Sequence, residues 1–250
     1  MRATSEKTRP SLFWFLAVLV VPFVSFVAKI RVRDAEKLPH SGAFVLAPNH
    51  YSEFDPLIVA TAVWRLGRAP RFMAKESLFR VPVLGWALRG TGMIPVARAS
   101  SSAAAKQTLK QSAELVEHGR GIIVYPEGTL TRDPDLWPMR GKSGAVRLAL
   151  AGEIPLVPMA HWGTQKVMGR YQKGLSLWPP RKKVDVVIGD PVDLSDLYGR
   201  SGERTVLVEA NDRLMAAITA LLEQLRAEKA PAERWNPSEH GQKETGRLDS

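Results

Sequence analysis

The feature that most constrains the fold is a series of short apolar runs separated by longer segments with helical spacing. Residues 44–47, 93–96, 121–125 and 154–159 are almost wholly apolar, and 184–189 carries a single aspartate. Such runs are typical of strands whose two faces are both covered by helices. Their alternation with helical segments predicts one α/β domain with a mixed, largely parallel sheet flanked by helices.

The segments between these runs carry helix signals. Pro56 follows an aspartate and precedes three apolar residues, which is typical of the first turn of a helix. Pro82 and Gly85 interrupt the apolar segment 76–89, so two short helical pieces are expected there rather than one long helix. A further strand is expected over 71–74, and further helices are expected over 103–117, 143–151 and 203–228.

An apolar stretch from Leu12 to Ile30 precedes the first strand. Its length is near the lower limit for a membrane-spanning helix, which needs roughly 17–25 apolar residues. Pro22 divides the stretch, and basic residues flank it on both sides, so no orientation across a membrane is favoured. We therefore expect residues 1–33 to anchor the chain as a broken helical hairpin in one leaflet. A single spanning helix and a buried core helix are the alternatives.

The overall charge predicts an acidic partner. The formal net charge is +10 and the isoelectric point is near 10, which favours either nucleic acid or an anionic membrane surface. Residues 165–183 interleave basic and aromatic side chains but form no nucleic-acid module, so a membrane-facing edge is the better interpretation. Residues 34–228 are expected to form the folded domain. The tail, residues 229–250, is rich in polar residues and is expected to be disordered.

A histidine and an aspartate lie together where the first strand ends and a helix begins. The segment reads Asn49-His50-Tyr51-Ser52-Glu53-Phe54-Asp55. His50 has the chemistry of a general base, because an imidazole with an ordinary pKa of about 6.5 is largely neutral at pH 7. Asp55 is placed to orient it, although an aspartate at this position is also a good helix cap. The chain contains no cysteine and no Gly-x-Ser-x-Gly motif, which argues against a covalent acyl-enzyme.

Four short segments in a fixed order carry a family resemblance. They are Asn49-His50-x-x-x-x-Asp55, Gly92-x-Ile94-Pro95-Val96-x-Arg98, Pro126-Glu127-Gly128-Thr129 and Ile154-Pro155-Leu156-Val157-Pro158. Over about residues 35 to 195 the sequence resembles the glycerolipid acyltransferase family, and in particular bacterial 1-acylglycerol-3-phosphate acyltransferases. The segment Lys75-Glu76-Ser77-Leu78 belongs to the same resemblance. One position departs from the family pattern, because Leu130 stands where Glu-Gly-Thr is usually followed by arginine.

The resemblance implies a membrane-bound O-acyltransferase of phospholipid biosynthesis at the cytoplasmic face of the cell membrane, peripheral or monotopic. The acyl group would pass from acyl-CoA or acyl carrier protein to lysophosphatidic acid or glycerol 3-phosphate, with no cofactor, no metal and no nucleic acid. His50 is then the base and Asp55 its orienting carboxylate. Leu130 keeps a different lysolipid or glycolipid acceptor open, and a non-catalytic basic membrane-binding module is the remaining alternative. The residues expected to bind substrate are Lys75, Arg98, Glu127, Gly128, Thr129 and Arg132.

Overall fold

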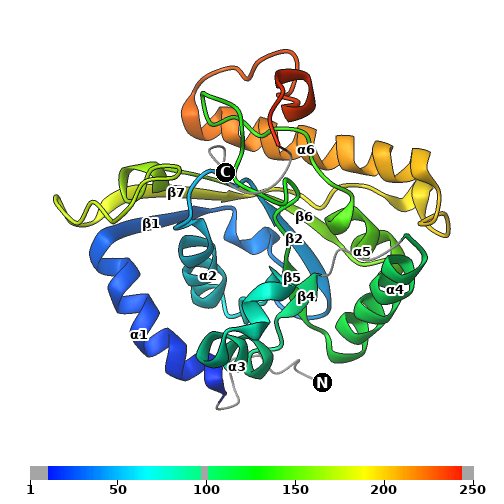
Figure 1. Ribbon diagram of the computed structural model, residues 1–250, viewed down its shortest axis with the longest axis horizontal. Helices are drawn as coiled ribbons and strands as arrows, with labels where there is room; N and C mark the ends of the chain where they lie inside the picture. Colours follow the sequence, from blue (N-terminus) through cyan, green and yellow to red (C-terminus); the bar gives the residue numbers. More distant parts are fainter. Residues whose placement is uncertain (1–10, 97–100, 244–250) are drawn as a thin grey trace.

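The computed structural model describes residues 11–96 and 101–243 of the chain. It forms one α/β unit around a five-stranded sheet with the strand order β1-β7-β6-β2-β5 (Figure 1). The pairs β1–β7, β2–β6 and β2–β5 are parallel, and only β6–β7 is antiparallel among them. The expected mixed, largely parallel sheet flanked by helices is therefore confirmed. Its strands are β1 (Ala28–Arg33), β2 (Phe44–Pro48), β5 (Gly121–Ile123), β6 (Leu156–Trp162) and β7 (Lys182–Ile188).

Helices cover both faces of this sheet, which explains why its central strands are apolar throughout. All five residues of β2 are buried. Val45 and Ala47 pack with one group of helices, and Phe44 and Leu46, which point to the opposite face, pack with another. The first group contains α4 (Ser101–His118), α5 (Gly144–Gly152) and α6 (Arg204–Arg226), and the second contains α1 (Leu12–Val27) and α2 (Asp55–Arg65).

A smaller parallel sheet lies beside the main one. It pairs β3 (Met73–Lys75) with β4 (Ile94–Val96). Between them the chain forms a short 3₁₀ helix, Glu76–Arg80, and then α3 (Pro82–Gly90). The expected interruption is confirmed, because Pro82 begins the second piece, where its missing N–H costs no hydrogen bond.

The N-terminal segment differs from the expected helical hairpin. Residues 12–27 form one helix that contains Pro22, and residues 28–33 continue directly into β1 at the edge of the main sheet. The hairpin prediction and its boundary at residue 33 are therefore wrong. Residues 28–33 form a strand because they pair with a distant part of the chain. Along β1, basic residues alternate with residues that pack against the core, and the parallel partner strand β7 lies about 150 residues later in the sequence.

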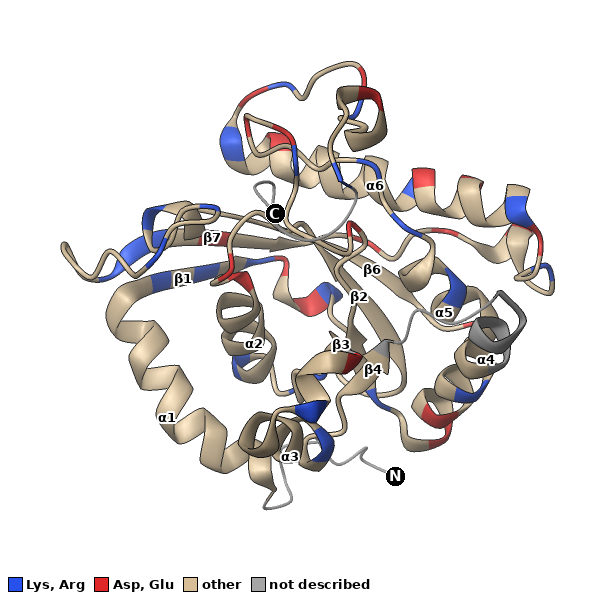
Figure 2. Cartoon of the chain, viewed as in Figure 1, with Lys and Arg blue, Asp and Glu red and all other residues tan. Residues whose placement is uncertain are grey.

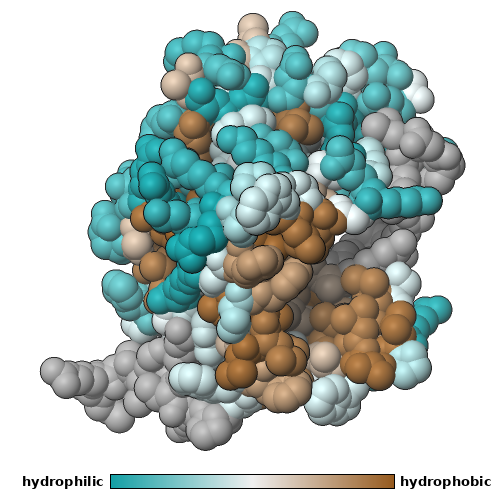
Figure 3. All heavy atoms as spheres, turned by 90° about the vertical axis from the view of Figure 1, so that its left-hand side faces the viewer, coloured by the Kyte–Doolittle hydropathy of each residue, from teal (hydrophilic) through white to brown (hydrophobic). Residues whose placement is uncertain are grey.

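One side of α1 packs on α2 and the other is exposed. Val24 and Val27 are buried, whereas several large apolar side chains of α1 remain open to solvent. Figure 3 shows hydrophobic side chains gathered on the lower part of the face that carries α1. None of the helices in the described ranges is long and apolar enough to cross a membrane. The exposed side chains of α1 are Trp14, Phe15, Val18, Leu19, Phe23 and Phe26.

The expected disordered tail is ordered over residues 229–243, which corrects that prediction. Arg234 forms an ion pair with Asp212 of α6 at 2.9 Å, and the backbone N–H of Arg140 donates to the carbonyl of Trp235. Trp235 also stacks on His240, with ring centroids 3.5 Å apart. These contacts hold the tail against α6 and the loop before α5. Residues 244–250 lie outside the described residues.

Candidate active site

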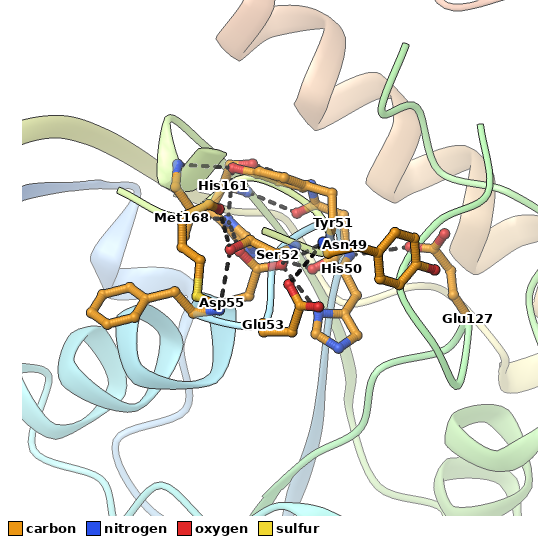
Figure 4. Close-up of polar contacts among 12 residues, drawn as sticks. Asn49, His50, Tyr51, Ser52, Glu53, Asp55, Glu127, His161 and Met168 are labelled. Atoms are coloured by element: carbon orange, nitrogen blue, oxygen red, sulfur yellow. Dashed lines mark hydrogen bonds and ion pairs between the residues drawn. The ribbon is translucent and has the colours of Figure 1, made fainter. Parts of the chain in front are cut away.

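Three parts of the chain meet at the edge of the sheet where β2, β5 and β6 end. These strands are parallel, so their carboxyl ends lie at one edge, the usual place for ligands in α/β sheets. The loop after β2 carries His50, the loop after β5 carries Glu127, and β6 contributes His161 near its end. Figure 4 shows His50 and His161 near Asp55, the first residue of α2, and Glu127 farther away, beyond His50.

Asp55 and His50 form the hydrogen-bonded pair that the sequence predicted. His50 Nδ1 lies 3.1 Å from Asp55 Oδ2. The same oxygen accepts the backbone N–H groups of Tyr51 at 2.7 Å and Ser52 at 2.8 Å. The carboxylate therefore bonds residues that precede α2 and not the helix's own first turn, so it does not act as a helix cap. Three donors on one oxygen fix its position against His50.

The other ring nitrogen of His50 is free to act. The His50 side chain is 15% exposed, whereas that of Asp55 is fully buried. Its ring stacks on Tyr125 with centroids 4.0 Å apart, and Nε2 points away from Asp55 in Figure 4. No residue in the described ranges hydrogen-bonds to Nε2. A base of this kind needs one anchored nitrogen and one accessible nitrogen, and His50 has both.

A buried polar network lies behind this pair. His161 Nε2 lies 3.0 Å from the carbonyl oxygen of Asn49, which only accepts, so the Nε2 nitrogen carries the proton. Its Nδ1 therefore accepts, from the hydroxyl of Tyr51 at 3.2 Å or of Thr164 at 3.3 Å. The Asn49 side chain donates to the His161 carbonyl and accepts the His161 backbone N–H. This exchange extends the β2–β6 pairing by one step and fixes the backbone that carries His50.

Burial keeps His161 neutral. Its side chain has no exposed surface, and this desolvation lowers the pKa of the imidazole below its usual 6.5. Asp55 Oδ1 lies 3.8 Å from His161 Nδ1, which is beyond hydrogen-bonding distance. His161 therefore supports the site as a neutral, fully engaged side chain.

Glu127 joins two loops from inside the protein. Its Oε1 accepts the backbone N–H of His50 and its Oε2 accepts that of Met139, both at 3.1 Å. Burial raises the pKa of this carboxyl from 4.5 to about 8, against the opposing effect of the two N–H bonds. Glu127 was expected to bind substrate, and in the structure both of its carboxyl oxygens bond to backbone N–H groups, which connects the loop that carries His50 with Met139.

Gly128 and Thr129 lie at the surface next to Glu127. Gly128 has a φ of +69°, and a Cβ atom there would lie 3.1 Å from the side chain of Lys142. Both the conformation and the close approach favour glycine at this position. Thr129 is partly exposed, so both residues remain available to a ligand.

Comparison with known proteins decides the family. A family model described as acyltransferase matches residues 29–162, which is more than half of the 250-residue chain. The chain belongs to the acyltransferase family. The matched region contains the His50–Asp55 pair, Glu127 and His161.

Several relatives have more specific names. The chain is 31% identical over 160 residues to the chloroplastic 1-acyl-sn-glycerol-3-phosphate acyltransferase BAT2 of Brassica napus, covering 64% of this chain and 43% of that protein. It thus spans less than half the length of that plant relative. It is 28% identical over 216 residues to the 1-acyl-sn-glycerol-3-phosphate acyltransferase of Bacillus subtilis, covering 86% of this chain and 100% of that protein.

A solved structure supports the fold of this acyltransferase. The crystal structure of the 1-acyl-sn-glycerophosphate (LPA) acyltransferase PlsC from Thermotoga maritima matches with a TM-score of 0.62 at 22% identity. The match covers 88% of this chain and 83% of that one. At this identity the likeness establishes a shared fold.

Of the three basic residues expected to bind substrate, the structure describes the side chain of Arg132 alone. Arg132 is only 1% exposed, and its Nη1 donates to the Tyr171 hydroxyl at 2.8 Å, so the structure does not present it on an open surface. Leu130 is also buried, at 6% exposure. Arg98 lies outside the described residues, as does the side chain of Lys75.

Sequence reasoning missed Asn49, Tyr51 and His161 as parts of the site. A usable signal was present, because His161 is a titratable residue that directly follows an apolar run. The expected strand ended at Met159, however, whereas β6 continues to Trp162. Across the described residues, no three His, Asp or Glu side chains are grouped so that they could hold a metal ion.

Proposed function

We propose that this acyltransferase is a 1-acylglycerol-3-phosphate O-acyltransferase of phospholipid biosynthesis. It transfers a fatty acyl group from acyl-CoA or acyl carrier protein to lysophosphatidic acid and requires no cofactor. The observation that carries the proposal is the His50–Asp55 pair, joined at 3.1 Å on a carboxylate that two backbone N–H groups hold in place. The names of the Brassica napus and Bacillus subtilis relatives support this choice of acceptor.

The reaction uses His50 twice. Nε2 takes the proton of the acceptor hydroxyl while the hydroxyl oxygen attacks the carbonyl carbon of the thioester. When the tetrahedral intermediate collapses, the C–S bond breaks, and the thiolate leaves and takes the proton from the imidazolium. A thiolate leaves readily because an ordinary thiol has a pKa of about 8.5. The products are phosphatidic acid and the free thiol of the carrier.

Asp55 makes His50 an effective base. It accepts the Nδ1–H, which fixes the tautomer with Nε2 unprotonated, and its charge stabilises the imidazolium that forms during the reaction. Its own hydrogen bonds to Tyr51 and Ser52 prevent the carboxylate from turning away. General base catalysis of this type contributes about 10²–10⁴-fold to a rate.

The exposed apolar surface suits an enzyme whose acceptor and product are lipids. Figure 2 shows α1 free of charged residues, followed by the basic residues of β1. We propose that α1 lies in one leaflet at the cytoplasmic face of the membrane, with the basic residues at the headgroups. Val83 and Trp86 of α3 are 80% and 61% exposed and extend the apolar surface.

The acceptor is tested by incubating the purified full chain with labelled oleoyl-CoA and lysophosphatidic acid, glycerol 3-phosphate, lysophosphatidylcholine or a lyso-ornithine lipid. Label is expected in phosphatidic acid, with little transfer to acceptors that lack a phosphomonoester. A strong preference for lyso-ornithine lipid is the second candidate outcome, which buried Leu130 favours because the usual arginine is missing. Absence of transfer to every acceptor contradicts the proposal and supports a non-catalytic module.

A further inference from the structure

A cavity lies beside Glu127, on the side away from His50. It has a volume of about 780 Å³ and lies between the loop that follows Glu127, the first half of α6 and the C-terminal tail. The tail is held there by its backbone contact with Arg140, and Asn211 of α6 donates to the carbonyl of Gly141. The wall is therefore built from three separate parts of the chain. Its polar lining includes Arg140, Lys142, Ser143, Arg147 and Arg204.

Three of the four arginines that line this cavity differ from neighbouring arginines in how they are paired. Elsewhere on this side of the molecule, Arg213 pairs with Asp196 at 2.7 Å and Arg200 with Glu203 at 2.6 Å. By contrast, three arginines that line the cavity form no ion pair with a carboxylate in the part of the chain that the structure describes. They are Arg140, Arg147 and Arg204.

The balance of charge in the cavity is positive. Five cationic and four acidic side chains line it. Of the acids, Asp212 is neutralised by Arg234 at 2.9 Å, and Glu127 is largely protonated at neutral pH because its pKa is about 8. Glu233 and Glu239 remain on the tail side, opposed by the three arginines that form no ion pair. An anion entering this cavity thus meets a net positive surface.

The N-terminus of α5 opens into the same cavity. Ser143, the N-cap residue, makes no capping bond to the helix, and its hydroxyl instead accepts from Nε of Arg147 at 3.1 Å. Apart from its chain neighbours and the backbone of its own helix, no heavy atom lies within 4 Å of the place where a Cβ on Gly144 would be, so the first turn is open. Uncapped N–H groups beside arginines form a favourable setting for phosphate oxygens.

The position of His50 argues against the acceptor phosphate as the occupant. Glu127 stands between the two sites, with Oε1 on the N–H of His50 and Oε2 on that of Met139, and Met139 lines the cavity while His50 does not. In lysophosphatidic acid the phosphate is on the carbon next to the reacting one and must stay close to His50. In coenzyme A the whole pantetheine arm separates the phosphates from the thioester.

We propose that this cavity binds the 3′-phosphate and diphosphate of coenzyme A while the thioester reaches His50 past Gly128. The inference rests on the proposed acyl transfer and names its donor. Three unpaired arginines with Lys142 match the several charges of the nucleotide better than the single phosphodiester of an acyl carrier protein. Lys142, which packs over Gly128, links the cavity to the exposed Gly128–Thr129 surface.

The test measures binding separately from turnover. Adenosine 3′,5′-bisphosphate is titrated by calorimetry into the wild-type chain, Arg204→Ala, and Arg140→Ala combined with Arg204→Ala. Both arginines are exposed, so truncation leaves the core intact, and thermal melting verifies this. Arg200→Ala is the matched control, because Arg200 is an exposed arginine outside the cavity whose charge is paired with Glu203.

We expect the Kd for the bisphosphate to rise about tenfold per arginine, the factor that corresponds to roughly 1.4 kcal/mol. The KM for acyl-CoA should rise in parallel, with kcat at saturating donor and the KM for the acceptor unchanged. Arg200→Ala should behave as wild type. Unchanged bisphosphate binding in the double variant overturns the proposal, as does a rise in KM confined to acyl carrier protein or to the acceptor.

The two proposals fail in different ways. If the wild-type chain transfers no acyl group to any acceptor, the proposed function is wrong, while the bisphosphate titration still decides whether the cavity binds nucleotide phosphates. If transfer to lysophosphatidic acid is seen and the titration shows no binding, only the donor site is wrong.

Discussion

His50 and His161 are the same side chain placed on two sides of one carboxylate. Nδ1 of His50 lies 3.1 Å from one oxygen of Asp55, and Nδ1 of His161 lies 3.8 Å from the other. The His50 side chain is 15% exposed and that of His161 is not exposed at all. The two histidines therefore differ more in solvent exposure than in distance from Asp55.

The difference shows what a histidine needs in order to act as a base. Both nitrogens of His161 are engaged by neutral partners, and burial lowers the pKa of its imidazole, so taking up a proton there is unfavourable. His50 has one nitrogen anchored on Asp55 and the other directed away from it (Figure 4). We infer that His161 holds the loop and His50 performs the chemistry.

Asp55→Asn should produce the largest effect on turnover with intact structure. If the amide oxygen takes the place of Oδ2, it keeps the bonds from Tyr51 and Ser52, and the amide nitrogen then faces Nδ1 of His161. Only the charge that stabilises the imidazolium is lost, so kcat should fall by roughly 10²–10⁴-fold. Steady-state kinetics and thermal melting are measured on one preparation. A kcat within threefold of wild type is incompatible with this role of Asp55.

His161→Leu should reduce stability more than catalysis. It leaves the Asn49 carbonyl and the Tyr51 hydroxyl without their buried partner, which costs roughly 1–3 kcal/mol in the free energy of unfolding. The kcat of the folded fraction should fall less than tenfold. His161→Gln is the control, because its amide can still donate to the Asn49 carbonyl and should restore part of the stability. A loss of kcat equal to that of His50→Ala would place His161 in the chemistry.

Glu127 should make stability depend on pH in a defined window. Its pKa is about 8 in the folded protein and about 4.5 when unfolded, so between these values the folded state holds more protons. The free energy of unfolding therefore falls as pH rises from 4.5 to 8, by up to roughly 1.4 kcal/mol per pH unit. Denaturant unfolding across this range should show a flatter slope for Glu127→Gln than for wild type. Equal slopes would mean that Glu127 is ionised in the folded state.

Tyr51→Phe should have the smallest effect. It removes a hydroxyl that lies 3.2 Å from Nδ1 of His161, while the Thr164 hydroxyl, at 3.3 Å, can still donate to this nitrogen. The cost in unfolding free energy should be about 0.5–1.5 kcal/mol, with kcat within twofold of wild type. A large loss of kcat would show that the network behind Asp55 takes part in proton transfer.

The sequence predicted the sheet and the His50–Asp55 pair because both depend on local order. Apolar runs reveal strands buried on both faces, and the five-residue spacing of the pair spans one strand-to-helix loop. His161 was missed because it reaches Asn49 only through the parallel pairing of β2 and β6, which are 112 residues apart at this contact. No local pattern reports such a pairing.

The two ends of the chain illustrate the same limit. Residues 28–33 have the composition of a basic flank, and only their pairing with β7 makes them a strand. Residues 229–243 have the composition of a disordered tail, yet Arg234 pairs with Asp212 and Trp235 stacks on His240. The composition of a segment indicates only the average loss of conformational entropy when it becomes ordered. A few specific contacts determine whether that loss is offset.

The most direct test of the account is the transfer of labelled oleate from oleoyl-CoA to lysophosphatidic acid by wild type and His50→Ala. His50 is partly exposed and its backbone N–H bond to Glu127 does not depend on its side chain, so the variant should melt close to wild type. If His50 is the base, kcat should fall by about 10²–10⁴-fold in the folded variant. Formation of phosphatidic acid by folded His50→Ala within threefold of the wild-type rate would contradict it.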